Sequence, residues 1–535
     1  MPSDATFRLA VRNVASQGET DVFPRSFEGH VFHDREDRVI ALLRELHDDF
    51  DAALANSPPT AEQALAPVGY TGFRWASLIE PVWNTYLLAL ALDVAPAIEK
   101  ERREHVDSSA YSYRYSPDAE TARIFTEDGW VKFRRASLES AEQYPFVIVT
   151  DIADFYPRIY HHRLKNSLSR LAPGSDIPNR VDRVLSELSD GYSFGLPVGG
   201  PAARLFAEAA ITPVDRLLTT SGIHFRRFAD DYHIFVAARD EAYGALTRIS
   251  EVLRPEGLSL QKSKTQIMTS IELKRRLALD ANIEGEPEAG GGEDQRTQFL
   301  RIALHFDPYS PTAAEDYERL KSDVARFDIL GMLAAEIRKS QIHVALTRRL
   351  LRAIRFLDQE SQFGAVLSLV DNLDTLAPVL PAVLITIAAA IHEFDTEQRS
   401  RIVTAVQERL ASGDPLFRLH LNVAFALRVI VQHYSPQGEE TIARVYKNAP
   451  SFVRRDIILL MAQWKASHWL SEQRGQYANF PISERRAFLL ASYALGDEGR
   501  HWRDRLALSG FDQLVREWMG ARVTAGNRTM PLGAN

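Results

Sequence analysis

The stretch RRFADDYHIF, Arg226 to Phe235, places two adjacent aspartates inside an otherwise apolar and aromatic run. Removing an unpaired carboxylate from water is costly, so Asp230 and Asp231 need either solvent or a cation. A hairpin turn would leave both side chains in water, because aspartate is common in turns. A site for a hard cation is the alternative, since carboxylate oxygens hold Mg²⁺ beside substrate phosphates. The pair alone does not decide between these interpretations, so the neighbouring motifs must.

A third acid lies upstream, at the end of an apolar run that is typical of a strand. The segment FVIVTDIADFYPRIYHHRL, 146–164, reaches Asp151 and continues through Asp154, Phe155 and Tyr156. By itself this pattern also fits a strand that leads into a helix capped by aspartate.

Two further segments complete the set. GLPVGGPAARLFAEA, 195–209, is a loop with Pro197 and Gly199 that opens directly into a helix, and glycine lets a backbone approach a ligand closely. EGLSLQKSKTQI, 256–267, carries Lys264 and Thr265 in a predicted turn. Each segment alone is common on protein surfaces, so their order carries the information.

That order resembles the palm domain of reverse transcriptases over roughly the first half of the chain. TDIADFY is similar to their motif A, GLPVGGPAARLFAEA to motif B, FADD to motif C and GLSLQKSKT to motif D. The resemblance implies an RNA-directed DNA polymerase, a nucleotidyltransferase whose catalytic residues are Asp151, Asp230 and Asp231. These acids would hold two Mg²⁺ ions, with Mn²⁺ as a substitute, and the Ile152 carbonyl would be a further ligand. Two such ions activate a 3′-hydroxyl and stabilise the leaving pyrophosphate.

The resemblance also suggests a nucleotide site. YSYRYS, 111–116, and WVKFRRAS, 130–137, lie where the fingers of these enzymes approach the triphosphate. Tyr156 matches the aromatic position that excludes ribonucleotides. The expected nucleotide-binding residues are Arg114, Lys132, Arg134, Arg135, Asp154, Phe155, Tyr156, Pro197, Gly199 and Lys264. Ordinary surface positions remain the alternative for the arginines.

Composition limits the class of protein. The chain has 535 residues, 45% hydrophobic and 25% charged, which indicates a globular protein of about two to four domains. The lack of cysteine excludes disulfides, thiol nucleophiles and cysteine-based zinc sites. A net charge of −8 excludes a generally basic nucleic-acid binder and leaves room only for local basic surfaces. We find no signal peptide, and apolar stretches such as LLALALDVA are too short to span a membrane, so we expect a cytoplasmic protein.

The domain organisation follows from a change of pattern along the chain. We predict an α+β fold: reverse transcriptase-like fingers and palm over 1–283, an acidic Gly-rich linker over 284–298, and an α-helical domain over 299–535. Amphipathic helices of the last part favour a HEAT-like repeat, with an irregular bundle as the alternative.

Departures from the common pattern narrow the resemblance. Phe228 stands where tyrosine is usual in motif C, Val198 stands where glutamine is frequent in motif B, and no basic thumb follows motif D. A compact palm followed by helices resembles the bacterial abortive-infection (Abi) and "unknown group" reverse transcriptases of antiphage defence. That group implies dNTP substrates, protein-primed and untemplated DNA synthesis with DNA attached to the protein, and homo-oligomers such as trimers or hexamers. The alternatives are templated copying of a cognate noncoding RNA, or a degenerate palm that acts as a scaffold.

Overall fold

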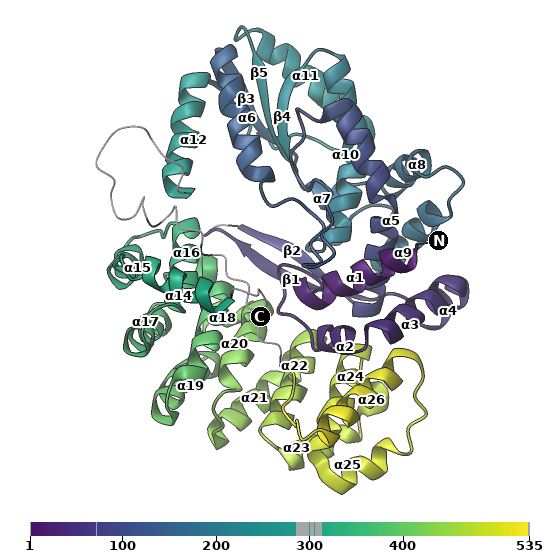
Figure 1. Cartoon of the computed structure of the whole chain (residues 1–535), viewed down its shortest axis with the longest axis vertical. Coiled ribbons are helices and arrows are strands. Elements are labelled where there is room, and N and C mark those ends of the chain that lie inside the picture. The colour runs from purple at the N-terminus through teal and green to yellow at the C-terminus, as the bar shows by residue number, and fades with distance from the viewer. Residues whose placement is uncertain (1, 71, 285–298, 300–303, 305–312, 533–535) are drawn as a thin grey trace. The chain divides into compact units, whose positions relative to one another are not determined.

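The chain divides into two compact units (Figure 1). The computed structural model describes residues 2–70, 72–284, 299, 304 and 313–532. Unit 1 comprises Met1–Val22, Glu28–Gln63 and Ala76–Ala278, and unit 2 comprises Phe23–Phe27, Ala64–Trp75 and Leu279–Asn535. The linker predicted over 284–298 lies outside the described residues, apart from Glu284.

Unit 1 contains a four-stranded antiparallel sheet with the strand order β4-β5-β3-β6. The strands are β3 (Phe146–Asp151), β4 (His224–Phe228), β5 (Asp231–Val236) and β6 (Gln266–Thr269). The strands are short and rich in β-branched and aromatic residues, which suit a pleated, half-buried surface. Val147 and Ile148 of β3 are fully buried, so this strand lies at the centre of the unit's core.

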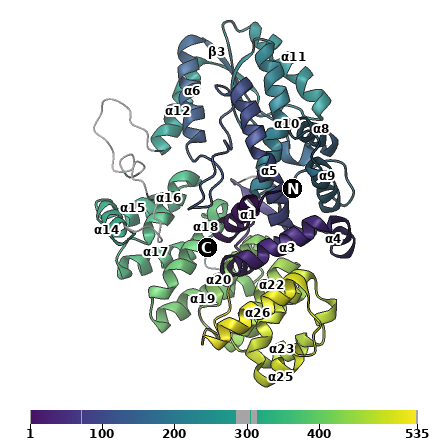
Figure 2. The same cartoon turned by 45° about the vertical axis from the view of Figure 1, so that its right-hand side comes forward.

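Helices α6 (Gly129–Gln143) and α12 (Ser270–Glu284) cover one side of the sheet (Figure 2). A buried cluster joins them to it: Ala141 of α6, Val147 of β3, Phe235 of β5, and Leu273 and Leu277 of α12. Because strand side chains alternate between faces, Val147 and Phe235 meet these helices while their neighbours point to the opposite face.

The remaining helices of unit 1 surround this sheet or extend from it. They are α1 (Asp4–Gln17), α2 (Glu28–Asp34), α3 (Glu36–Asp48), α4 (Phe50–Asn56), α5 (Pro81–Val106), α7 (Phe155–Arg158), α8 (His161–Leu171), α9 (Ile177–Leu188), α10 (Pro201–Thr220) and α11 (Glu241–Leu253). The longest is α5, which packs along α10. It is also the one helix among the described residues that is long and apolar enough to match a membrane span, although 78% of its apolar window is buried inside the fold.

Two strands form a separate hairpin: β1 (Ala61–Val68) pairs with β2 (Gly72–Ile79). The described part of unit 2 is otherwise helical. Its α-helices are α14 (Ala313–Val324), α15 (Ile329–Ile337), α16 (Val344–Ile354), α17 (Gln359–Asp371), α18 (Leu380–Ala390), α19 (Thr396–Ala411), α20 (His420–Ile430), α21 (Pro436–Asn448), α22 (Ser451–Gln463), α23 (Ser467–Arg474), α24 (Ile482–Ala491), α25 (Gly496–Arg503) and α26 (Gly510–Thr524).

The helices of unit 2 pack in a repeating order. Even-numbered helices follow one another as neighbours, α16 against α18, α18 against α20, and so on to α26, and α17, α19 and α21 form a second row. Such two-row stacking is the arrangement of helical repeat proteins. It confirms the predicted fold class, an antiparallel sheet with helices followed by a helical repeat region.

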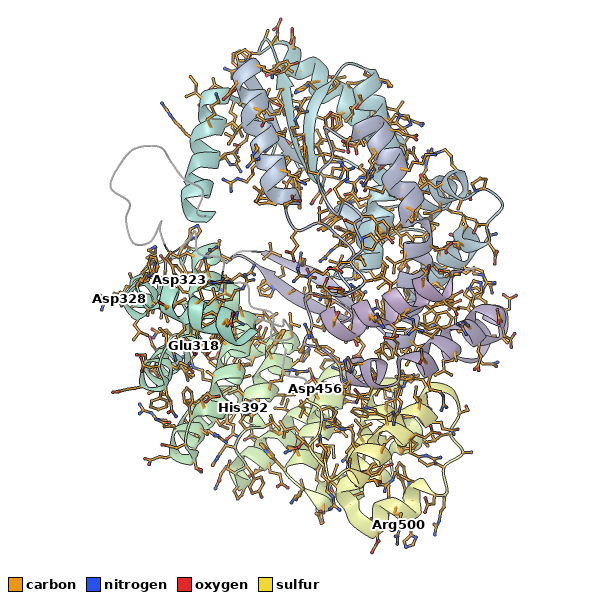
Figure 3. All side chains as sticks on the ribbon, in the orientation of Figure 1. Glu318, Asp323, Asp328, His392, Asp456 and Arg500 are labelled. Atoms are coloured by element: carbon orange, nitrogen blue, oxygen red, sulfur yellow. The ribbon has the colours of Figure 1, made fainter. Side chains whose placement is uncertain are left out.

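Charged residues follow the same division between core and surface. Figure 3 shows Asp456 among the helices and Arg500 at the edge of the unit. Asp456 is 2% exposed and accepts from Arg428, 2.8 Å, and Arg455, 2.9 Å. A buried carboxylate needs such partners.

Candidate active site

The three predicted catalytic aspartates lie together at one end of the unit 1 sheet. Asp151 is the last residue of β3, and the antiparallel register pairs it with Asp231, the first residue of β5. Asp230 lies in the turn before β5, and the Ile152 amide donates to its carbonyl, 3.0 Å. The acids from motifs A and C therefore meet because their strands are neighbours in the sheet.

The turn that carries Asp230 has an unusual backbone. Ala229 has a φ of +52°, a left-handed conformation that costs free energy for a residue other than glycine. The Arg227 guanidinium donates to the Ala229 carbonyl, 3.0 Å, and so helps to hold the turn. The orientation of Asp230 thus depends on a buried side chain three residues earlier.

Burial and crowding raise the pKa values of Asp230 and Asp231. Burial and the nearby Asp151 raise the pKa of Asp230 to about 7. Burial and Asp151 also raise the pKa of Asp231 to about 6, against the opposing effect of Lys264. These carboxylates therefore favour a nearby positive charge, which would offset both the repulsion and the burial.

Lys264 supplies one such charge. Its ammonium donates to Asp151, 2.5 Å, which raises the pKa of Lys264. The turn that carries it is tied to β3, because the Gln261 amide donates to the Asp151 carbonyl, 2.7 Å, and the hydroxyls of Thr150 and Thr265 share a hydrogen bond, 2.7 Å. The structure thus brings the Lys-Thr turn to the aspartates.

The three aspartates fit a Mg²⁺ ion that is also bound by water and substrate phosphates, rather than one enclosed by protein ligands alone. Among the described residues, no group of three or more His, Asp or Glu side chains forms a complete metal site. Mg²⁺ commonly uses one or two carboxylates together with waters and substrate phosphates. Asp151 and Asp230 can supply those carboxylates, with Asp231 beside them. Ile152 is 1% exposed, and its carbonyl remains a predicted ligand.

The Gly/Pro loop approaches a different segment of unit 1. Gly199 has a φ of +127°, and a Cβ at this position would lie 3.1 Å from the Cβ of Thr20. The Asp21 amide donates to the Gly199 carbonyl, 3.3 Å, and α10 starts two residues later at Pro201. Pro197 is half-buried in the same loop. Glycine is therefore required here by both conformation and space.

A pocket of about 380 Å³ lies between this loop and motif C. Its walls include Gly199, Arg204, Tyr113, Trp130 and Phe228, and Phe228 is two residues from Asp230. Aromatic walls with a few polar groups are usual for sites of small, flat ligands. The sequence placed the segments of Tyr113 and Trp130 near the triphosphate without singling out these two residues, and it did not assign Arg204 to a site.

Tyr156 lies beside this pocket and contacts one of its walls. Its hydroxyl interacts with that of Tyr113, and burial raises the pKa of Tyr156 well above its usual value. Tyr113 itself has a φ of +45°, and its ring packs 6.0 Å from that of Phe228, between centroids. The predicted sugar-selecting residue is thus next to the pocket rather than in the apolar core. Phe155, by contrast, is 3% exposed and belongs to the core.

The predicted phosphate ligands have varied surroundings. Arg114 pairs with Glu99, 2.6 Å, and Asp107, 2.7 Å, and the buried Arg134 donates to the Leu277 carbonyl, 2.7 Å. Lys132, Asp154 and Arg135 are exposed. Lys132 pairs with Asp128, and Asp154 pairs with Arg158. Of the predicted cationic ligands, only Lys264 contacts one of the predicted catalytic aspartates, Asp151.

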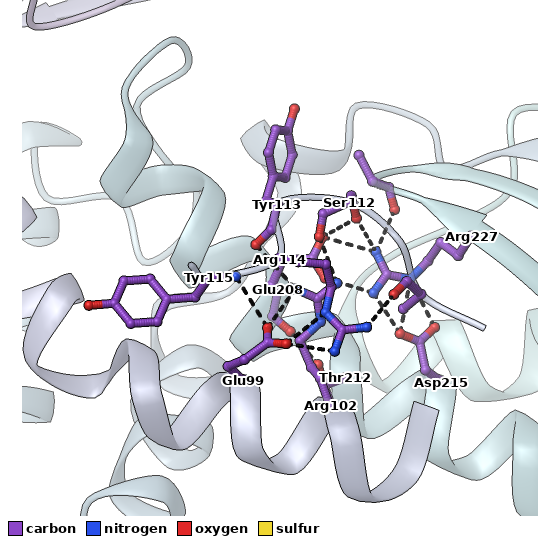
Figure 4. Close-up of polar contacts among 12 residues, drawn as sticks. Glu99, Arg102, Ser112, Tyr113, Arg114, Tyr115, Glu208, Thr212, Asp215 and Arg227 are labelled. Carbon is purple, nitrogen blue, oxygen red and sulfur yellow. Dashed lines mark hydrogen bonds and ion pairs between the residues drawn. The ribbon is translucent and has the colours of Figure 1, made fainter. Parts of the chain in front are cut away.

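A buried ion network supports the site, and sequence reasoning did not identify it (Figure 4). Arg227 of β4 pairs with Glu208, 2.8 Å, and Asp215, 2.7 Å, both on α10. Arg102 of α5 contacts Glu208 as well, 3.3 Å. Burial opposes ionisation of Glu208, but the two arginines outweigh it and lower its pKa. The available signal was the presence of two carboxylates, Glu208 and Asp215, in a largely apolar helix, since buried charges need partners.

Comparison with known proteins identifies this part of the chain. Residues 94–331 match the family described as "Reverse transcriptase (RNA-dependent DNA polymerase)". No curated protein matches this chain.

Among solved structures, the chain is similar to two yeast telomerases. Apo telomerase from Candida tropicalis has 12% identity and a TM-score of 0.32, with 72% of this chain and 66% of that chain covered. Telomerase from Candida albicans in complex with a TWJ fragment of telomeric RNA has 10% identity and a TM-score of 0.33, with 74% and 63% covered. This chain thus spans slightly less than two thirds of each telomerase chain.

Both TM-scores are low, so the assignment depends on the family match and on the motif geometry. The match spans motifs A to D and the three aspartates, and the observed sheet brings these aspartates together. The chain therefore contains a reverse transcriptase domain, the catalytic domain of RNA-directed DNA polymerases.

Proposed function

We propose that this chain is a DNA polymerase that adds dNTPs at the site formed by Asp151, Asp230 and Asp231. The main support is that these carboxylates lie together at the ends of β3 and β5, with the Lys264 ammonium bonded to Asp151. In the reaction a hydroxyl oxygen bonds to the α-phosphorus of a dNTP, the bond to the β-phosphate oxygen breaks, and pyrophosphate leaves with its electron pair. The hydroxyl proton passes to solvent.

The residues of the chain position and select the substrates. Asp151 and Asp230 would hold two Mg²⁺ ions, which supply activation of the hydroxyl and charge stabilisation of the pyrophosphate when bound. Lys264 places a positive charge where the triphosphate is expected. Tyr156 and the aromatic pocket limit the space around the sugar and the base.

The wider role is abortive infection in antiphage defence, in the cytoplasm. Support comes from the resemblance of the motifs to the Abi group and from the helical repeat that follows the palm. Protein priming fits this arrangement, because a tethered hydroxyl reacts at high effective concentration and removes the need to hold a free primer. Candidates for the priming hydroxyl in the helical region are Tyr434, Tyr446, Tyr477 and Tyr493.

Exposure favours one of these tyrosines. Tyr434 is 49% exposed, whereas the Tyr493 hydroxyl donates to the Arg516 carbonyl and the Tyr446 hydroxyl donates to Glu484. Tyr434 is therefore the first candidate to substitute. We also propose that the chain assembles into a homo-oligomer.

A second candidate function is templated copying of a cognate noncoding RNA. The description of the matched family, an RNA-dependent DNA polymerase, favours it. Incorporation that follows the sequence of a supplied RNA would distinguish it from untemplated synthesis.

The decisive experiment measures dNTP incorporation with Mg²⁺ for the wild type and for Asp230→Asn and Asp151→Asn. Asparagine keeps the shape and removes the charge, so we expect both variants to fold and to lose incorporation by at least about 1,000-fold. Asp240→Asn, which changes an exposed acid of unit 1 just before α11, is the matched control. Incorporation at the wild-type rate by either active-site variant would refute the assignment.

Priming is tested on the same protein with radioactive dNTP. Label that stays with the boiled polypeptide and gives a sharp band after nuclease supports protein priming, and Tyr434→Phe should remove it. DNA that separates freely from the protein would exclude this mode.

A further inference from the structure

A pocket of about 580 Å³ lies within unit 2, among the helices of the repeat region (Figure 1). Residues of α21, α22, α23 and α24 line it, and α22 packs against the other three helices. The lining includes Tyr446, Arg454, Trp469, Gln473, Phe480 and Glu484. A volume of this size is typical of sites for small organic ligands or single side chains of a partner.

One carboxylate of this lining is buried with few hydrogen bonds. Glu484, in the first turn of α24, is 1% exposed. Its Oε2 accepts from the Tyr446 hydroxyl, 3.3 Å, whereas its Oε1 accepts no hydrogen bond from any described residue. A buried carboxylate oxygen without a donor is costly, so a donor from outside the chain would stabilise it.

The neighbouring arginine does not supply that donor. Arg454 Nη1 lies 4.0 Å from Glu484 Oε1, beyond hydrogen-bond distance. The other nitrogens of Arg454 donate to carbonyls of α21, Nε to Tyr446, 3.1 Å, and Nη2 to Lys447, 3.4 Å. The guanidinium of Arg454 is therefore held by α21, and Glu484 can accept from a second cation.

Another buried carboxylate of unit 2 shows the contrast. Asp456 accepts from Arg428, 2.8 Å, and Arg455, 2.9 Å, and these arginines outweigh burial and lower its pKa. Burial raises the pKa of Glu484, in spite of the opposing effects of Ser451 and Arg454. The charge of Asp456 is thus compensated within the chain, and that of Glu484 is not.

The other walls of the pocket suit a flat cation. Tyr446, Trp469 and Phe480 supply aromatic surface, and the rings of Trp469 and Tyr446 meet edge-on, 5.0 Å apart between centroids. Glu472 adds an exposed carboxylate, and Gln473 adds an amide oxygen. A guanidinium group is planar and weakly hydrated, stacks on aromatic rings and donates two parallel N–H bonds to a carboxylate. An ammonium group has no flat face, so these walls favour guanidinium.

We propose that this pocket binds a ligand that carries a guanidinium group, with Glu484 as its anionic partner and Trp469 and Phe480 as its aromatic walls. A free guanidine compound and an arginine residue of a partner protein present the same planar cation. The inference does not depend on the polymerase assignment, because the pocket and the catalytic aspartates belong to different units.

The test is isothermal titration calorimetry of the full-length protein with matched probes. Agmatine represents a free guanidine compound, and N-acetylarginine amide represents an arginine residue. We expect saturable binding of both, and the tighter of the two identifies the source of the group. N-acetylcitrulline amide has nearly the shape of the arginine probe without its charge, so it should bind about tenfold more weakly or less. N-acetyllysine amide tests the preference for guanidinium over ammonium.

Variants test the two parts of the pocket separately. Glu484→Gln keeps the shape and removes the charge, so it should weaken binding of the tighter probe about 10- to 100-fold. Phe480→Leu removes an aromatic wall and should weaken binding about threefold to tenfold. Glu440→Gln is the matched control, because Glu440 is an exposed acid of α21 that pairs with Arg444 and does not line the pocket. Melting by circular dichroism confirms that each variant folds.

Several results would overturn the inference. One is equal binding of the arginine probe and the citrulline or lysine probe, a comparison that needs only the wild-type protein. Another is the absence of saturable binding of both guanidine probes up to about 20 mM, a weak affinity even for a ligand of this size. Binding of glutarate in their place would assign the pocket to an anion held by Arg454.

The outcome is independent of the proposed function. Glu484→Gln should lose binding of the guanidine probe and keep incorporation of dNTPs, whereas Asp230→Asn should lose incorporation and keep binding. Unchanged probe binding by Glu484→Gln would refute the role of this carboxylate whether or not the protein polymerises.

Discussion

Replacement of Arg227 by methionine should destabilise unit 1 by about 3–5 kcal/mol, the usual cost of removing one partner from a buried ion pair. Arg227 is fully buried and donates to Asp215, Glu208 and the Ala229 carbonyl. After the substitution, Glu208 keeps Arg102 and Ser112 as partners, but Asp215 keeps only the hydroxyls and backbone around it, such as Tyr232, 2.7 Å. A fully buried carboxylate without a cation accounts for most of the expected loss.

The measurement is urea unfolding of the full chain, followed by circular dichroism and by tyrosine and tryptophan fluorescence. Arg226→Met is the matched control, because Arg226 is the adjacent residue of β4, is half-buried and donates to the Phe225 carbonyl, 3.0 Å. Its effect should stay within about 1 kcal/mol. A double variant, Arg227→Met with Asp215→Leu, should recover part of the loss, because it removes the stranded charge.

The same variant also tests the link to catalysis. Loss of the bond to Ala229 releases the strained turn before Asp230, so incorporation should fall even at temperatures where the variant is folded. A loss of stability below about 1 kcal/mol for Arg227→Met, or a loss equal to that of Arg226→Met, would refute the reasoning that a buried network holds the catalytic turn.

Three further substitutions test other parts of the site. Tyr156→Ala should reduce the preference for dNTPs over rNTPs by about tenfold or more, and an unchanged preference would count against a sugar-selecting role. Gly199→Ala should destabilise the loop by about 1–2 kcal/mol, because a φ of +127° and a contact of 3.1 Å with Thr20 oppose a side chain. Gly244→Ala, in a helix with open space around the Cβ position, should be neutral or stabilising and is the control. Burial lowers the pKa of His161, whose Nε2 bonds to the Gly195 carbonyl, 2.8 Å, so the folded state binds fewer protons than the unfolded state. Stability should therefore fall as the pH drops below about 6.5, and His161→Gln should show a smaller decline over pH 7 to 5 in thermal melts.

The turn that carries Asp230 and the order of the motifs could be predicted from the sequence because their determinants are local. A strand ending in Asp151 and a turn ending in Asp230 are read from short segments, and the antiparallel register then places them side by side. Helices of the C-terminal part could be predicted for the same reason, because amphipathic periodicity is a property of each helix. Their two-row stacking did not follow from this periodicity, because an irregular bundle would bury the same apolar faces.

The contacts of the basic residues could not be predicted in this way, because their partners are distant in sequence. Arg134 and Lys264 look alike in a sequence of charged residues, yet Arg134 is buried against the carbonyl of Leu277, 143 residues away, and Lys264 lies against Asp151, 113 residues away. Only the packing of α6 on α12 determines the first contact. Local sequence therefore suggests Arg134 as a phosphate ligand, although in the folded protein its guanidinium donates to the Leu277 carbonyl.

The buried network shows why a polymerase site would carry such distant pairs. Arg227 connects β4 to α10, and Arg102 connects α10 to α5, so residues far apart in the chain must all be in place before the turn at Ala229 is held. Ion pairs of this kind add little net stability over apolar packing, but they are strongly destabilising when only one partner is present. The network therefore destabilises partly folded forms of unit 1, in which a buried charge lacks its partner, more than the complete fold. A correctly oriented Asp230 would then occur only in molecules in which β4, α5 and α10 have packed together, which makes formation of the catalytic site depend on completion of the fold.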